Sequence, residues 1–168
     1  MTKIISQMTK IGEHHYVESH GMFYEDFEVN DIYDHKPGRT ITETDNIWLS
    51  LICMNNHPLH VDNAYANQTE FKRTLVSSLV TFALVGGLSL RGTSARGVVN
   101  LGWEKIKLVA PVYVGDTIYA TTKVLSKRLS KSRQNQGIVT VETNGIKEDN
   151  TTFLTCTRSF LVPLKHSA

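Results

Sequence analysis

The stretch from Val76 to Leu90 most constrains the fold of this chain. Nearly every position in it is apolar, so a helix built from it would have no polar face. A helix that is apolar all round is expected to be buried rather than to lie on a surface. The stretch is interrupted by Ser77, Ser78, Thr81 and the pair Gly86-Gly87, and it is too short and too polar to span a bilayer. It is therefore predicted to be a buried central helix.

The segments after this helix are predicted to be consecutive β-strands. Four of them are rich in β-branched and apolar residues and are separated by turn residues, as in antiparallel hairpins. They cover residues 98–108, 118–128, 137–146 and 152–163. One long buried helix followed by such strands predicts an α+β fold, with an antiparallel sheet wrapped around a long central helix.

The residues before the central helix predict a strand and two shorter helices. Residues 32–41 read as an extended strand, and Thr42 with Asp45 resembles a capping box that opens a helix. That helix must end before Pro58, because the residue before a proline is disfavoured in helical conformation. Asp62 can cap a second short helix over residues 63–71.

Length and composition predict one domain. Residues 1–20 are polar and aperiodic and read as an N-terminal extension, and residues 21–168 as a single domain. A net charge of +2 is too small to indicate nucleic acid as a partner. Cys53 and Cys156 are expected to be buried free thiols, and no Cys or His spacing resembles a metal site. Without a signal peptide or membrane span, the chain is expected to be cytoplasmic.

Two motifs resemble those of the MaoC-like dehydratase family, which includes the (R)-specific enoyl-CoA hydratases. The first is Asn55-Asn56-His57-Pro58-Leu59-His60, which resembles the family's hydratase motif Gly-Asp-x-Asn-Pro-x-His. The second is the run from Ala110 to Thr117, Ala-Pro-Val-Tyr-Val-Gly-Asp-Thr. The resemblance extends over residues 23–163 and implies a hotdog fold that adds water to, or removes it from, an acyl-CoA thioester. Hotdog protomers of this type resemble one another in that they pair through the edges of their sheets. A homodimer or higher homo-oligomer is therefore expected.

The resemblance also suggests roles for site residues. The family's catalytic histidine falls on His60, its catalytic aspartate on Asn55, and its His-Gly before the central helix on Ser77-Ser78. An imidazole can exchange protons near neutral pH, whereas an amide can only orient a water. His60 and Asn55 are thus the predicted catalytic pair. The backbone N–H of Ser78, at the start of the central helix, is the predicted donor to the thioester oxygen.

Further candidates have structural roles that explain them equally well. Asp45 and Asp62 could replace the missing carboxylate, but both are predicted helix caps. The residues Lys127, Arg128, Lys131 and Arg133 could hold the phosphates of coenzyme A, or form a solvated hairpin loop. Four aromatic residues are expected in the core or the acyl pocket: Trp48, Phe82, Trp103 and Tyr119.

Three functions are compatible with these residues. The first is a hydratase or dehydratase that needs no cofactor beyond the coenzyme A of its substrate. The second is a hotdog acyl-CoA thioesterase, although the central helix contains no Asp or Glu for that reaction. The third is a non-catalytic acyl-CoA-binding module, which the Asn55 substitution favours and His60 disfavours.

Overall fold

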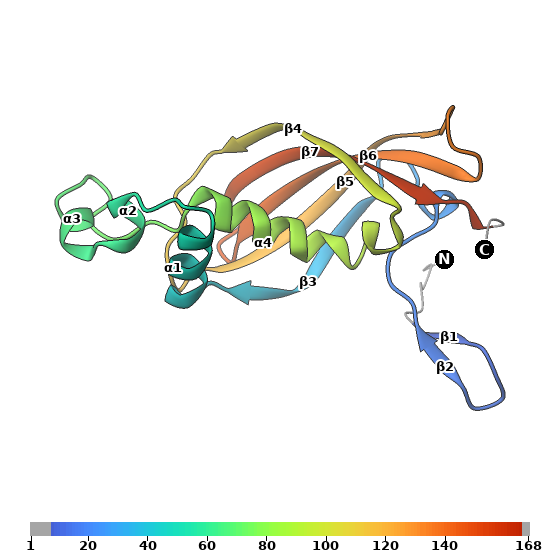
Figure 1. The fold of residues 1–168 in the computed structure, drawn as a ribbon, viewed down its shortest axis with the longest axis horizontal. Helices are drawn as coiled ribbons and strands as arrows, with labels where there is room; N and C mark the ends of the chain where they lie inside the picture. The colour runs from blue at the N-terminus through green and yellow to red at the C-terminus, as the bar shows by residue number, and fades with distance from the viewer. Residues whose placement is uncertain (1–7, 166–168) are drawn as a thin grey trace.

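An antiparallel sheet curves around the long helix α4 (Ser78–Leu90), as Figure 1 shows. The computed structural model describes residues 8–165. The strands lie in the order β3-β5-β6-β7-β4. Their bounds are β3 (Ile32–Thr40), β4 (Val99–Leu108), β5 (Thr117–Leu129), β6 (Gln136–Lys147) and β7 (Thr152–Pro163). The predicted α+β architecture is therefore confirmed.

The middle strands of the sheet show why these residues form it. Along β6, buried and half-buried positions alternate from Gly137 to Gly145, as expected for side chains that point to opposite faces of a strand. β6 pairs with β5 from Ile118↔Lys147 to Leu129↔Gly137, and with β7 along its other edge. The two strands at the outer edges, β3 and β4, carry bulges in their pairing.

The core consists of two apolar clusters along the sheet. One lies between α4 and the sheet and includes Val80, Val85, Ile118 and Phe153. The other gathers Val139, Val141 and Phe160 around Phe27, next to the short 3-10 helix η1 (Tyr24–Asp26). A second 3-10 helix, η2 (Ser94–Arg96), joins α4 to β4.

Some side chains expected inside the protein lie on its surface. Trp48 is 68% exposed and Trp103 is also exposed, so their expected place in the core is wrong. Phe82 is half-buried, with its ring centroid 5.6 Å from that of Trp103. Cys156 is buried as expected, whereas Cys53 is exposed.

The helix α4 is buried on one face only. Val80, Thr81, Val85 and Ser89 are buried against the sheet, while Leu79 and Leu90 on the other side are exposed. The neighbouring strand β4 also exposes apolar side chains, among them Leu101 and Ile106. A helix that is apolar all round is therefore only half covered by its own chain.

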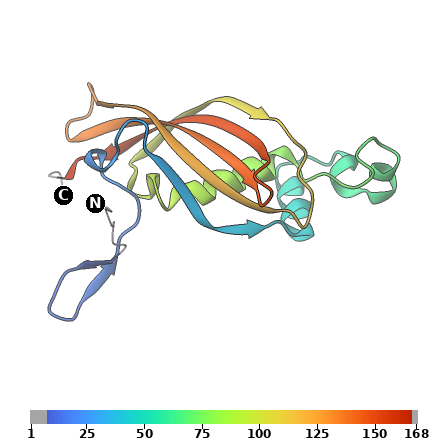
Figure 2. The ribbon, with the colours of Figure 1, turned by 180° about the vertical axis from the view of Figure 1, so that it is seen from behind.

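Three α-helices lie between β3 and α4, namely α1 (Glu43–Ile52), α2 (Pro58–Val61) and α3 (Asn63–Asn67). The predicted capping box of α1 is present, because the Thr42 hydroxyl accepts from the Asp45 N–H and the Asp45 carboxylate accepts from the Thr42 N–H. Asp62 caps α3 as expected, but α3 ends at Asn67 rather than near Phe71. Figures 1 and 2 show α2 and α3 projecting beyond one end of the sheet.

An N-terminal hairpin lies at the opposite end of the molecule from α2 and α3 (Figure 1). It consists of β1 (Met8–Lys10) and β2 (Tyr16–Glu18) and falls within the expected extension over residues 1–20, of which residues 1–7 lie outside the described part. Arg91, just after α4, joins it to the domain through an ion pair with Glu18. None of the helices within residues 8–165 has the length and apolar character needed to cross a bilayer.

Candidate active site

His60 is held at the C-terminal end of the single-turn helix α2. Pro58 occupies the first turn, and the His57 side chain before it accepts a hydrogen bond from the Leu59 N–H. The Nδ1 atom of His60 lies 3.0 Å from the carbonyl oxygen of Leu75. A carbonyl oxygen can only accept, so Nδ1 carries the ring hydrogen of the neutral imidazole. Nε2 is then left with a lone pair that can take a proton.

Asn55 lies between α1 and α2, next to the start of α4. Its Nδ2 donates to the Ser77 hydroxyl at 3.0 Å, and its backbone N–H donates to the Ser50 carbonyl at 2.8 Å. These contacts fix the side chain and leave its amide oxygen available as an acceptor. Asn55 can therefore orient a water but cannot deprotonate one.

Ser78, whose backbone N–H is the predicted donor to a thioester oxygen, lies at the N-terminus of α4. Ser77 is the N-cap residue, and its side chain makes no capping hydrogen bond. Ser78 is the first residue of the helix, and the first N–H groups of a helix have no partner within it. These groups also carry the positive end of the helix dipole, which favours negative charge.

A pocket of about 350 Å³ is lined by His60 and by the start of α4, whereas Asn55 is not among its lining residues. Its polar lining is His60, Ser78 and Thr81. The remaining lining is apolar and comes from the segment before α4, from the end of β4 and the segment that follows it, and from β7: Phe71, Leu75, Val76, Leu108, Val109, Ala110, Pro111, Val112 and Phe153. An apolar pocket with few polar groups, in this size range, is typical of small-molecule sites.

Asn46 is the residue of this region that the sequence did not point to. It lies on the inner face of α1 and donates from Nδ2 to the carbonyl oxygens of His60 (2.9 Å) and Leu75 (3.2 Å). Its Oδ1 accepts from the Ser77 N–H at 2.9 Å. The available signal was a polar pair, Asn46 and Ser50, one turn apart on a helix whose apolar residues lie elsewhere; both are buried.

The two aspartates considered as substitutes for the missing carboxylate have structural roles. Desolvation alone would raise the pKa of the Asp45 carboxyl, but hydrogen bonds from Thr42 and the charge of Arg39 outweigh it and lower that pKa below its ordinary value. Asp45 also forms an ion pair with Arg39. Asp62 accepts from the Tyr65 N–H at 3.0 Å as the cap of α3. Neither residue lines the pocket of His60.

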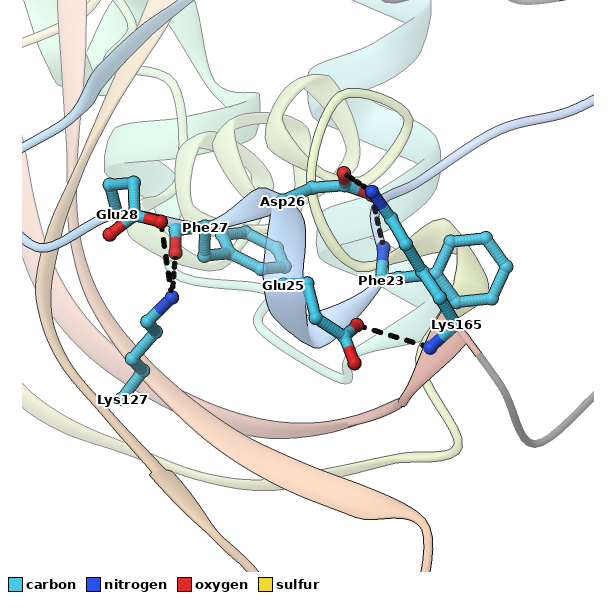
Figure 3. Close-up of polar contacts among 7 residues, drawn as sticks. All are labelled: Phe23, Glu25, Asp26, Phe27, Glu28, Lys127 and Lys165. Carbon is cyan, nitrogen blue, oxygen red and sulfur yellow. Dashed lines mark hydrogen bonds and ion pairs between the residues drawn. The ribbon is translucent and has the colours of Figure 1, made fainter.

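The structure does not bring the predicted coenzyme A cations together with His60. β5 begins with Thr117, at the end of the sheet where the pocket lies. Because a strand rises about 3.3 Å per residue, Lys127 lies roughly 30 Å further along it. Figure 3 shows the Lys127 ammonium beside the Phe27 carbonyl and the Glu28 carboxylate. Arg128 follows it on β5, and Lys131 and Arg133 lie in the loop before β6 at the same end.

Other cations lie closer to the pocket. Lys72 and Arg73 directly follow Phe71, which lines it. The Arg73 guanidinium stacks on the Tyr113 ring at 3.6 Å from the centroid, and Tyr113 pairs with Leu75 in an isolated β-bridge. This contact holds Arg73 near the rim of the pocket.

Comparison with known proteins identifies the family. The model of the MaoC like domain matches residues 26–146. The beta-methylmalyl-CoA dehydratase of Chloroflexus aurantiacus is 30% identical over 76% of this chain and 36% of its own length. The (R)-specific enoyl-CoA hydratase of Aeromonas caviae is 33% identical over 45% of this chain and 55% of its own length. The chain thus spans less than half the length of the first of these relatives.

Solved structures show the same fold. A Mycobacterium tuberculosis protein described as having a double hotdog fold matches 88% of this chain with a TM-score of 0.79, at 20% identity and over 46% of its own chain. The sheet wrapped around α4 is therefore a hotdog fold, as the motifs predicted. This chain corresponds in extent to about half of that double protein.

Proposed function

The chain belongs to the MaoC-like dehydratase domain family, and from this premise we propose that it hydrates a 2-enoyl thioester of coenzyme A or dehydrates the corresponding 3-hydroxyacyl thioester. The observation that carries the proposal is the pocket that His60 shares with the N-terminus of α4. It combines a proton-exchanging group with a donor for negative charge, beside an apolar lining that suits an acyl group.

Each group has a role in the addition of water. As the water oxygen bonds to C3, Nε2 of His60 takes a proton from the water, and the π electrons move toward C2 and the thioester oxygen. The Ser78 N–H and the positive end of α4 stabilise that oxygen. The imidazole then gives a proton to C2, so that no proton is gained or lost overall. The Asn55 amide oxygen accepts a hydrogen bond from the water and orients it.

An assay with crotonyl-CoA tests the proposal against its two rivals. Loss of the enoyl absorbance without release of free thiol is the expected result. Release of coenzyme A as a thiol would indicate a thioesterase instead. Binding of the thioester with neither change would indicate a non-catalytic acyl-CoA-binding module, the function that Asn55 in place of an aspartate favours.

The coenzyme A phosphates need cations outside the pocket. Lys72 and Arg73 lie at the rim and are exposed, so they suit this role for the pocket of their own chain. The loop with Lys131 and Arg133 can approach a pocket only if that pocket belongs to another chain. Both arrangements use the charge-assisted hydrogen bonds that phosphates accept.

A second copy of the chain suits the uncovered apolar face of α4 and β4. Leu79, Leu101, Trp103 and Ile106 are all exposed on these two elements, and extensive exposed apolar surface is typical of a protein–protein contact. This chain covers 36% of the beta-methylmalyl-CoA dehydratase and 46% of the double hotdog protein, so both relatives are longer than the domain described here.

We expect light scattering to show a homodimer or a multiple of it at micromolar concentration. Trp103→Glu should weaken this assembly, because it would bury a charge at the interface. Leu129→Glu is the matched control, since Leu129 is exposed at the far end of β5. A wild-type monomer would contradict the proposed pairing.

A further inference from the structure

We propose that Asn46 is a positioning residue, which holds His60 and the first turn of α4 in a single arrangement. The residue is 1% exposed, and its side chain joins α1 to α2 and to the segment just before α4. The amide nitrogen donates to the carbonyl oxygens of His60 and Leu75, and the amide oxygen accepts from the Ser77 N–H. The catalytic meaning of this role rests on the function proposed above, whereas the contacts do not.

One of these contacts acts on the imidazole itself. The Leu75 carbonyl oxygen accepts from Asn46 Nδ2 at 3.2 Å and lies 3.0 Å from His60 Nδ1. A carbonyl oxygen has two lone pairs and can serve both donors. The acceptor that determines which ring nitrogen of His60 carries hydrogen is thus held in place by Asn46. The main chain of His60 is bound to the same amide, at 2.9 Å.

The third contact acts on the other half of the site. Asn46 Oδ1 accepts from the N–H of Ser77, the residue before the predicted oxyanion donor Ser78. The Ser77 hydroxyl in turn accepts from Asn55. One buried amide therefore sets the distance between the proton-exchanging ring and the start of α4. A shift of about 1 Å in such a distance can cost roughly 10²-fold in rate.

Only an amide satisfies this set of partners. Two carbonyl oxygens need donors and one N–H needs an acceptor. A leucine at this position would remove the amide from all three and leave the Leu75 carbonyl with His60 Nδ1 alone, and an aspartate would turn an oxygen toward two carbonyl oxygens. Buried polar groups left unpaired are destabilising, so every substitution is expected to lower the melting temperature. Stability alone therefore does not distinguish positioning from packing.

The experiment compares Asn46→Asp and Asn46→Ser with Thr143→Val, a matched loss of a buried polar group. Thr143 is also buried and bonded, with its hydroxyl 3.0 Å from that of Thr122, and it does not line the pocket of His60. Three quantities are measured for each protein: the melting temperature, kcat and KM with crotonyl-CoA, and the ¹⁵N shifts of the His60 ring.

In the wild type we expect the neutral His60 ring to carry its hydrogen on Nδ1. In Asn46→Asp, and to a smaller extent in Asn46→Ser, the two ring shifts should move toward each other as the tautomers mix. We also expect kcat to fall by about 10²-fold in Asn46→Asp with KM little changed. Thr143→Val should lower the melting temperature but leave kcat and the tautomer as they are.

The outcomes separate this inference from the proposed function. An active wild type whose Asn46 variants keep both kcat and tautomer would overturn the positioning role and leave the hydratase proposal standing. An inactive wild type whose His60 ring shifts still depend on Asn46 would overturn the hydratase proposal and leave the positioning role standing. A hydrogen on Nε2 in the wild type, or equal losses of kcat in Thr143→Val, would also overturn the role of Asn46.

Discussion

The two ends of α4 each bring a histidine next to polar partners, but the two surroundings differ. At the N-terminal end, His60 lines a pocket together with Ser78, and its Nδ1 is bound to the Leu75 carbonyl. At the C-terminal end, the side chain of His35 from β3 is 2.8 Å from the Thr122 hydroxyl through Nε2, and the residue is only 6% exposed. His35 also borders two pockets, but charged residues such as Lys36 and Arg91 line these, whereas the pocket of His60 is lined mainly by apolar residues.

The charges at the two ends differ as the helix dipole requires. Arg158 is 5% exposed, and its guanidinium donates to the Thr93 hydroxyl, which donates to the Ser89 carbonyl near the end of α4. A cation is favourable at this negative end of a helix, and an anion at the other. Burial, and next to it the charge of Arg158, lower the pKa of His35. The C-terminal end is thus suited to a neutral, structural imidazole.

The comparison shows what makes a histidine near a helix a candidate for catalysis. At the pocket end, the Leu75 carbonyl, itself held by the Asn46 amide, directs the His60 imidazole, and the helix dipole favours the negative charge that the proposed reaction develops. At the other end a similar number of polar groups saturate one another within the core. Four predictions test this distinction, beginning with the largest expected effect.

Replacing the two histidines separately should give the largest difference in activity between the two ends of α4. General acid–base assistance contributes about 10²–10⁴-fold, so His60→Ala should lower kcat with crotonyl-CoA by at least about 10²-fold while the protein stays folded. His35→Gln should lower the melting temperature and leave kcat nearly unchanged. Steady-state kinetics and circular dichroism measure both effects. A fully active His60→Ala protein would refute the mechanism, whatever the fold.

Charge reversal at the pocket rim should have the next largest effect. The double variant Lys72→Glu with Arg73→Glu should raise KM for crotonyl-CoA about tenfold, as expected for the loss of one charge-assisted hydrogen bond. Turnover should change little, because such binding is the same in the ground state and the transition state.

The matched control reverses Lys131 and Arg133 in the β5–β6 loop. Both variants change the net charge by the same amount, so general electrostatic attraction of the substrate cancels from the comparison. An effect on KM from the loop alone, measured at low salt, would mean that the loop of one chain reaches the pocket of another.

Asn55→Asp should change activity less than His60→Ala or the charge reversal at the pocket rim, and it tests the role of the amide next to the start of α4. A carboxylate at this position can accept a hydrogen bond from the Ser77 hydroxyl and can also share a proton with the water. Turnover of crotonyl-CoA should therefore remain at the wild-type level or rise. A fall in activity would indicate that the amide of Asn55 contacts the acyl group directly, and that its replacement by an anion removes this contact.

The sequence predicted the fold better than the site. The apolar stretch of α4, the capping box of Thr42 with Asp45 and the alternation along β6 each follow from local sequence, and the five strands of the main sheet begin and end within about two residues of their expected bounds. The hairpin of β1 and β2 was not expected in the aperiodic residues 1–20. Trp48 was misplaced because the same periodicity does not say whether an apolar face packs on its own chain or stays open. Asn46 was missed because its partners are backbone groups, two carbonyls and one N–H, which leave no mark in the sequence.

The smallest predicted effect concerns pH and the buried end of α4. Because the pKa of His35 is lowered in the folded state, the unfolded chain binds more protons than the folded one as the pH falls below about 6.5. The stabilisation from a neutral His35 is thus fully present above that pH and is lost as the pH falls toward the lowered pKa. The charges near the ring are Arg158, which lowers the pKa of His35, and Asp34, which raises it.

Between pH 7.5 and 5.5 the wild-type melting temperature should therefore fall more than that of His35→Gln, whose side chain does not titrate. For a chain of this size, a difference of about 2–4 °C corresponds to about 1 kcal/mol, which differential scanning fluorimetry resolves. Equal falls in both proteins would mean that His35 contributes nothing to the pH dependence, and the contrast between a structural and a catalytic histidine would then rest on geometry alone.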